Sequence, residues 1–307
     1  ETPEDLYFAT EGGGILEFNK KTESFRNFVI YNNSSKSFGQ NIIKSLYLDG
    51  NRILCGTNIG TIYSFDLKTQ KFSLFYDLKE EKSIYHVSRN SSGDLIIGSV
   101  SQNGLIIVPK DNPVNAQNSF PVKGLNKPVA FLNIRCVLEL EKNVYLIGTR
   151  HDGLYLYDKN NQTLANYRSN PNKNDPNKLP DNYISSIIKD SQGHIWIGTF
   201  GGGFCLFDRK DGTFKTFQRQ DSFLNNICYI VEDNKANLWI SATSGISRFD
   251  IKTGKFLNYN FSNGIKISEF SPHSGLKLHD GRIVFSGNNG FTIFDPSRLS
   301  PNPFVPP

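Results

Sequence analysis

The segment Gly193–Phe217 reads GHIWIGTFGGGFCLFDRKDGTFKTF, and its pattern indicates three antiparallel strands in a row. A short apolar run (IWIGT) meets a glycine-rich loop, an alternating run (FCLFD) follows, and an Asp-Gly turn leads into a third run (TFKTF). Asp-Gly turns are typical of tight hairpins, and period-two alternation is typical of half-buried strands. The segment just upstream, Tyr183–Gly193, predicts one more strand, so the unit has four.

The same unit recurs along the whole chain. Seven copies align on a small residue of the second strand, and they are about 46 residues apart, a period typical of repeat architectures. This residue is, in order, Ala9, Gly56, Gly98, Gly148, Gly198, Ser241 and Ser286. Four-stranded repeats of this period are typical of propeller blades, because each blade hides one face against the next. The sequence therefore predicts an all-β, seven-bladed β-propeller.

Both ends of the repeat array are incomplete. The first copy begins at its second strand, because nothing upstream of Leu6 can supply an inner strand, and the last copy stops after its third strand. We therefore expect the propeller to span residues 1–296 and a proline-rich linker to span residues 297–307, since such a tail cannot be a central strand. Methionine is absent where about six are expected, so we expect a fragment of a longer protein.

Three copies carry a family resemblance. Gly193–Phe217, Asn237–Tyr259 (NLWISATSGISRFDIKTGKFLNY) and Gly275–Leu299 (GLKLHDGRIVFSGNNGFTIFDPSRL) resemble two-component regulator propeller repeats. The resemblance implies the periplasmic sensor region of a Bacteroides-type hybrid two-component system. Such a region senses oligosaccharides derived from glycans and controls polysaccharide-utilisation genes. The resemblance also implies that this chain is the second, membrane-proximal propeller, and that the kinase lies outside it.

The same resemblance implies several partners. They are a first propeller and an Ig-like domain of the same sensor, and a second copy in a homodimer of the full-length protein. Two long connections, 109–133 and 167–181, flank the fourth copy, and we expect them to form a rim or to contact the first propeller. An alternative function is a ligand-free scaffold or dimerisation propeller that mediates protein–protein contacts. A propeller lyase or hydrolase is a third alternative, which would need converging histidines and acids.

Composition and spacing argue against several kinds of site. The net charge is +5 and the basic residues are spread along the chain, so we expect no nucleic-acid partner. No apolar run approaches the roughly 18 residues of a membrane helix, so we expect no direct membrane contact. The five histidines and four cysteines share no ligand spacing, and a strand follows each Gly-Gly-Gly run. We therefore expect no metal and no cofactor.

The repeated acids and tryptophans are interpreted as structural. Trp196 and Trp239 occupy equivalent second-strand positions, which favours core packing over sugar stacking. An aspartate closes the third strand in five copies, which indicates turn hydrogen bonding, and no GxSxG elbow is present. These aspartates are Asp66, Asp158, Asp208, Asp250 and Asp295. We therefore predict that the chain is not an enzyme.

The candidate ligand site lies on one face of the predicted propeller. The loops between second and third strands open on this face, as do the connections between successive copies, and loops on a rigid scaffold vary freely. An aromatic ring beside Arg, Asn and Asp suits a hydroxyl-rich ligand, although the same residues also fit ordinary loops. The candidate ligand-binding residues are Arg150, His151, Asp152, Phe200, Tyr183, Gln102 and Asn103.

Overall fold

The structure is a computed structural model that describes residues 1–30, 37–110, 116–169, 178–217, 224–259, 265–267 and 269–299. It is an all-β, seven-bladed propeller, as the repeats predict. The chain divides into two compact units. The first unit is Glu1–Ile147 with Tyr157–Leu164, and the second unit is Gly148–Leu156 with Ala165–Pro307.

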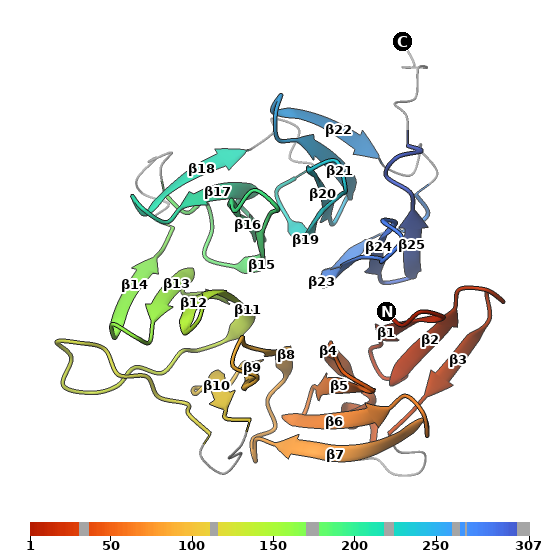
Figure 1. The fold of residues 1–307 in the computed structure, drawn as a ribbon, viewed down its shortest axis with the longest axis horizontal. Helices are drawn as coiled ribbons and strands as arrows, with labels where there is room; N and C mark the ends of the chain where they lie inside the picture. Colours follow the sequence, from red (N-terminus) through yellow and green to blue (C-terminus); the bar gives the residue numbers. More distant parts are fainter. Residues whose placement is uncertain are drawn as a thin grey trace. The chain divides into compact units, whose positions relative to one another are not determined.

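Seven sheets of three or four strands, in chain order, make the blades (Figure 1). The first sheet consists of β1 (Asp5–Ala9), β2 (Ile15–Asn19) and β3 (Phe25–Phe28). The second consists of β4 (Ile43–Asp49), β5 (Arg52–Thr57), β6 (Thr61–Asp66) and β7 (Lys71–Asp77). The third consists of β8 (Ile84–Arg89), β9 (Leu95–Ser99) and β10 (Leu105–Val108). The fourth sheet consists of β11 (Ile134–Glu141), β12 (Val144–Thr149), β13 (Leu154–Asp158) and β14 (Thr163–Tyr167). The fifth consists of β15 (Ile184–Lys189), β16 (Ile195–Thr199), β17 (Phe204–Asp208) and β18 (Thr213–Phe217). The sixth sheet consists of β19 (Ile227–Glu232), β20 (Asn237–Ala242), β21 (Gly245–Asp250) and β22 (Lys255–Tyr259). The seventh consists of β23 (Phe270–Lys277), β24 (Ile283–Gly287) and β25 (Gly290–Phe294). One short helix, α1 (Ser37–Asn41), precedes β4.

The first and last sheets have three strands, as the incomplete end copies predict. Downstream of β25, Leu299 still packs against the apolar cluster of the last two sheets. The proposed boundary at residue 296 stays a prediction, and residues 300–307 of the predicted linker lie outside the described residues.

The third sheet also has three strands, and a long connection covers its outer side. Gln117 pairs with Ile107 of β10, so this connection takes part of the place of a fourth strand. Further along, Phe120 and Phe131 pack against Tyr157, with ring centroids 5.5 and 5.9 Å from the tyrosine ring. The connection is therefore anchored by a buried aromatic cluster within the first unit. Its predicted contact with another propeller stays a prediction.

At Gly56 and Gly198 the small residue is explained by close packing between neighbouring blades. A Cβ atom on Gly56 would lie 2.7 Å from Ile84, and one on Gly198 would lie 2.7 Å from Ile227. In each pair the isoleucine stands at the start of the next inner strand. Any side chain at these positions would push neighbouring blades apart, which costs stability in a densely packed interior.

The tryptophans belong to the core, which confirms their predicted role. Trp196 packs against Phe204 and Phe249, with ring centroids 5.8 Å away in both cases. Trp239 stacks on Tyr259 at 5.5 Å. Cysteines add small apolar side chains to the sheets of the propeller: Cys55, Cys205 and Cys228 are buried, and Cys136 is half-buried. Burial alone raises the pKa of the Cys55 and Cys205 thiols, so both stay protonated.

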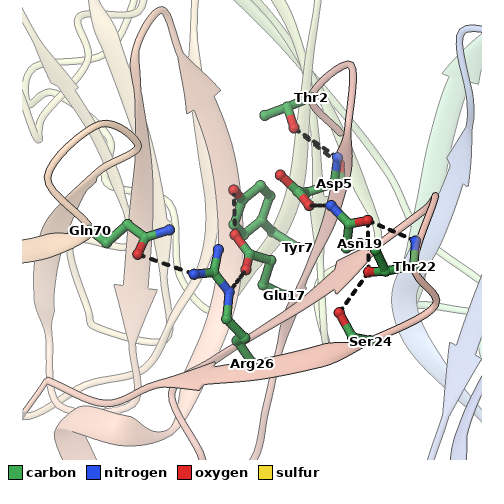
Figure 2. Close-up of polar contacts among 9 residues, drawn as sticks. All are labelled: Thr2, Asp5, Tyr7, Glu17, Asn19, Thr22, Ser24, Arg26 and Gln70. Atoms are coloured by element: carbon green, nitrogen blue, oxygen red, sulfur yellow. Dashed lines mark hydrogen bonds and ion pairs between the residues drawn. The ribbon is translucent and has the colours of Figure 1, made fainter.

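A row of polar side chains crosses the first sheet (Figure 2). Glu17 on β2 pairs in register with Tyr7 on β1 and with Arg26 on β3. The tyrosine hydroxyl donates to Glu17 Oε1 at 2.9 Å, and Arg26 Nε donates to Oε2 at 2.5 Å. Glu17 is only 2% exposed, so these two donors compensate for a buried carboxylate. Gln70, from the turn after β6, accepts a bond from Arg26 and ties the first sheet to the second.

Candidate functional site

Two of the candidate loops, β12–β13 and β16–β17, have the same pattern of hydrogen bonds. In the β12–β13 loop, the Thr149 hydroxyl donates to the carbonyl of Gly153 at 2.9 Å and accepts from the Asp152 amide at 2.8 Å. The β16–β17 loop repeats this arrangement, with the Thr199 hydroxyl bonded to the Gly203 carbonyl at 2.7 Å. A threonine at the strand end therefore fixes both ends of each loop, and the residues between project from a fixed base.

Three of the predicted site residues form one row in the second unit. The Arg150 guanidinium lies 5.9 Å from the centre of the Tyr183 ring, and the Tyr183 and Phe200 rings lie 5.3 Å apart with a 36° interplanar angle. Hydrogen bonds of the two backbone amides hold the row: the Phe200 amide donates to the Tyr183 carbonyl, and the Tyr183 amide donates to the Asp181 carboxylate. Arg150 is exposed, and both rings are half-buried. The row offers ring faces and a cation to a ligand.

Asp152 stands beside a cleft of about 830 Å³ in the same unit. Its carboxylate lies 3.3 Å from Arg168, and its carbonyl accepts from the side chain of Asn166 at 2.9 Å. The cleft is lined by Asn166, Arg168, Ser169 and Asn182, among others. Asn182 Oδ1 accepts the Ser169 amide at 2.8 Å. Amide, hydroxyl and guanidinium groups therefore surround one concave surface.

Sequence reasoning missed these cleft residues. Asn166 and Arg168 lie at the end of an outer strand, and Asn182 ends a long connection, so no motif joins them. The one available signal was the unusual length of the 167–181 connection, of which residues 170–177 lie outside the described residues.

The other predicted site residues do not join the row. The His151 side chain is exposed and makes no hydrogen bond or ion pair with the described residues. Gln102 and Asn103 belong to the other compact unit, in the loop between β9 and β10. Gln102 is exposed and Asn103 is half-buried. Whether any of the seven residues binds a ligand stays a prediction.

The repeated acids serve turns, as predicted. Asp208 accepts the Lys210 amide at 2.8 Å, and Asp250 accepts the Lys252 amide at 2.9 Å. Equivalent bonds are made by Asp66, Asp158 and Asp295. Asn19 plays the same part in the first copy, where it accepts the Thr22 amide at 2.9 Å (Figure 2). Within the described residues, no group of three or more His, Cys, Asp or Glu side chains could hold a metal ion.

His194 is part of a structural motif. Asp190 accepts from the Trp196 indole nitrogen at 2.9 Å and lies 2.9 Å from His194 Nδ1. Burial alone would raise the pKa of Asp190, but the hydrogen bonds from Trp196 and His194 together lower it below its ordinary value. His194 therefore supports a core tryptophan.

Comparison with known proteins finds similarity to a regulator propeller family and to a histidine kinase. Residues 178–201 match the two component regulator propeller family, which confirms the resemblance. A curated relative, histidine kinase P4 of Formosa agariphila, is 25% identical over 309 residues that cover 98% of this chain and 22% of the relative. The chain thus spans about a fifth of the length of that relative. The matched repeat contains Tyr183 and Phe200.

Solved structures with a TM-score above 0.5 share the fold. A streptogramin B lyase is 13% identical, with 95% of this chain and 89% of that chain covered and a TM-score of 0.69. The extracellular domain of a protein assigned to a hybrid two component system of B. thetaiotaomicron is 15% identical, with 96% and 52% covered and a TM-score of 0.42. At these identities the likeness says nothing about activity. No helix among the described residues is long and apolar enough to cross a bilayer.

Proposed function

We propose that this chain is an extracytoplasmic, periplasmic sensor propeller of a hybrid two-component histidine kinase. The family match carries the proposal, because it falls on the repeat that supplies Tyr183 and Phe200. The similarity to a histidine kinase over nearly the whole chain supports the same role. The kinase lies outside the chain, and the full-length protein works as a homodimer with a first propeller and an Ig-like domain.

The proposed ligand is a glycan-derived oligosaccharide that binds at the row Arg150–Tyr183–Phe200 and the cleft beside Asp152. Ring faces stack against the apolar faces of sugars, while the amides and guanidinium groups bond to paired hydroxyls. Binding favours one arrangement of the sensor domains over another, and the shifted population reaches the kinase. The output is control of polysaccharide-utilisation genes.

Calorimetric titration of the 307-residue chain with a panel of plant and host oligosaccharides tests the site. We expect Arg150→Ala and Phe200→Ala each to weaken binding about tenfold, which is 1.4 kcal/mol. Lys252→Ala, in the exposed β21–β22 turn, is the matched control and should leave binding unchanged. An oligosaccharide that binds both site variants as tightly as the unchanged chain would move the ligand elsewhere. Melting temperatures of the variants show that they are folded.

A second candidate function is a scaffold or dimerisation propeller, which exposed apolar side chains on outer strands favour. Phe25 on β3 is 54% exposed and Leu74 on β7 is 56% exposed, both in the first unit. Large apolar side chains on edge strands favour association. Sedimentation velocity of the chain with and without Leu74→Asn tests this: a dimer that dissociates in the variant supports the scaffold, and a monomer in both argues against it.

A further inference from the structure

A second cleft lies in the first unit. Its volume is about 850 Å³, and the residues that line it lie at strand ends and turns of the sheets β4–β7 and β8–β10. Figure 1 labels the strands of these two sheets. Three cationic side chains line it: Arg52 at the start of β5, Arg89 at the end of β8, and Lys110 just beyond β10. Nothing in the proposed function uses this cleft.

Asp49, the last residue of β4, orients both guanidinium groups. Its Oδ1 accepts from Arg89 Nε at 2.7 Å, and its Oδ2 accepts from Arg89 Nη2 at 2.8 Å and from Arg52 Nη2 at 2.9 Å. The hydrogen bond from Arg89, together with that from Arg52, lowers the pKa of Asp49 to about 2, against the opposing effect of burial. Asp49 is therefore ionised at neutral pH, and it cancels one of the two arginine charges while it fixes both side chains.

The other wall is aromatic, and a β-bulge explains it. Ile62 pairs with Tyr76 and Tyr63 pairs with Leu74, so Phe75 is an extra residue in β7. In a regular strand consecutive side chains point to opposite faces, but a bulge redirects one of them. Phe75 and Tyr76 consequently both line the cleft. The Arg52 guanidinium lies 4.6 Å from the centre of the Phe75 ring, which holds the cation over an apolar surface.

The side chains that line the cleft carry three positive and two negative charges. The carboxylate of Asp94, next to the lining residue Gly93, is held by the Asn90 side chain and by the Lys110 backbone amide. Three cations face two carboxylates, Asp49 and Asp66, and the Asp66 carboxylate is bonded to backbone amides of its own turn. Across the described residues, the Lys110 ammonium and the Tyr76 hydroxyl make no hydrogen bond or ion pair. Arg52 bonds through Nε and Nη2, which leaves Nη1 as a further donor toward a ligand. An oxyanion would satisfy these donors together.

We propose that this cleft binds a small organic anion. Its carboxylate, sulfate or phosphate head group contacts Lys110 and Arg52, and its apolar body lies against Phe75 and Tyr76. A planar guanidinium matches such head groups better than a point charge does, and the salt bridge to Asp49 holds Arg52 ready for binding. The apolar wall makes the cleft selective for an anion with a hydrophobic body over a bare inorganic ion.

Titration of the 307-residue chain with 3-phenylpropionate tests the proposal, because this probe carries both features. The neutral analogue 3-phenylpropanamide keeps the body without the charge, and inorganic sulfate keeps a charge without the body. We expect the acid to bind at least about tenfold more tightly than either comparison compound, and to weaken as salt is added. Equal affinity for the acid and the amide, or no binding of the acid at millimolar concentration, overturns the proposal.

Variants separate this cleft from general attraction to a basic protein. Lys110→Gln should weaken binding of 3-phenylpropionate about fivefold to tenfold, while Lys68→Gln, an exposed lysine outside the cleft, should not. Unchanged binding in Lys110→Gln contradicts the proposed site. Arg52→Gln is a second variant, checked first for folding because Asp49 depends on it. The probes and residues differ from those of the oligosaccharide test, so one proposal can fail without the other.

Discussion

Replacing Asp190 with asparagine should destabilise the protein only while Trp196 is present. Asp190 Oδ1 accepts the amides of Gln192 and His194 at 2.9 and 2.8 Å, and Oδ2 accepts the Trp196 indole at 2.9 Å. An asparagine has one acceptor oxygen, so it keeps the turn bonds and turns a donor toward the indole. His194 Nδ1, also 2.9 Å from Oδ2, keeps its bond because the other imidazole tautomer accepts from the new amide. A buried donor without its acceptor costs about 1–3 kcal/mol, which is the expected loss in free energy of unfolding.

The third blade supports this reasoning, because it carries asparagine where no indole follows. Asn90 holds the equivalent turn, where its Oδ1 accepts the Ser92 and Asp94 amides at 3.1 and 2.8 Å. Six residues later this copy has Ile96, whereas Trp196 and Trp239 follow Asp190 and Asp233 at the same spacing. Asp233 bonds to the Trp239 indole at 2.9 Å. The carboxylate therefore accompanies the tryptophan.

A double-mutant cycle with urea unfolding followed by circular dichroism measures the effect. Trp196→Phe has its own packing cost, but in that background Asp190→Asn should change the free energy of unfolding by no more than about 0.5 kcal/mol. The lowered pKa of Asp190 means that its contribution is complete above the unfolded value of about 3.9 and is lost at lower pH, so pH 7 is suitable. Equal costs in both backgrounds would refute the assigned role. Asp208→Asn, in an exposed turn, is the control.

Other consequences of the fold can be measured on the same chain. Gly153→Ala should lower the melting temperature far more than Gly254→Ala. Both sites have positive φ, but only at Gly153 would the new Cβ meet a carbonyl oxygen, that of Tyr167, at 2.2 Å. Similar losses in melting temperature would contradict this reason. Burial lowers the pKa of His86 to about 4, so the free energy of unfolding should fall as pH drops from about 6.5 toward 4. His86→Gln should flatten that part of the pH profile, and an unchanged slope would show that other groups cause it. In native protein, Ellman's reagent should modify Cys136 faster than the three buried cysteines, and equal rates would contradict their burial.

Short-range signals explain why the repeats were readable from the sequence. An aspartate that caps its own turn, such as Asp250, involves residues only two or three positions away, so its role follows from local spacing. The small anchor residue also recurs at a fixed place, because an isoleucine of the next inner strand packs against it at Gly56, Gly98 and Gly198. The second cleft shows the opposite case: Asp49 and Arg89 are 40 residues apart, and their contact depends on how two blades pack.

Irregular strands are the second reason why parts of the structure could not be predicted from the sequence. The bulge at Phe75 shifts the register of β7 by one residue, and the alternation of the sequence KFSLFYD does not show where the extra residue falls. The Arg150 row was predictable in part, because the repeats put these loops on one face. The cleft beside Asp152 was not, since its residues come from strand ends and from a connection without a repeat counterpart.

The two kinds of connection in a blade differ in how much sequence variation they tolerate. Turns that follow the third strand depend on the capping side chain itself, so a change there removes a hydrogen bond of the fold. In three blades the loop that follows the second strand is closed by a threonine, Thr57, Thr149 or Thr199, whose hydroxyl bonds to a carbonyl four residues on. Residues between those two points contribute no bond to the closure through their side chains. Arg150 and Phe200 occupy such positions. Replacing the exposed Arg150 should leave the blade intact, whereas replacing Phe200 also removes packing against the apolar cluster of the last two sheets.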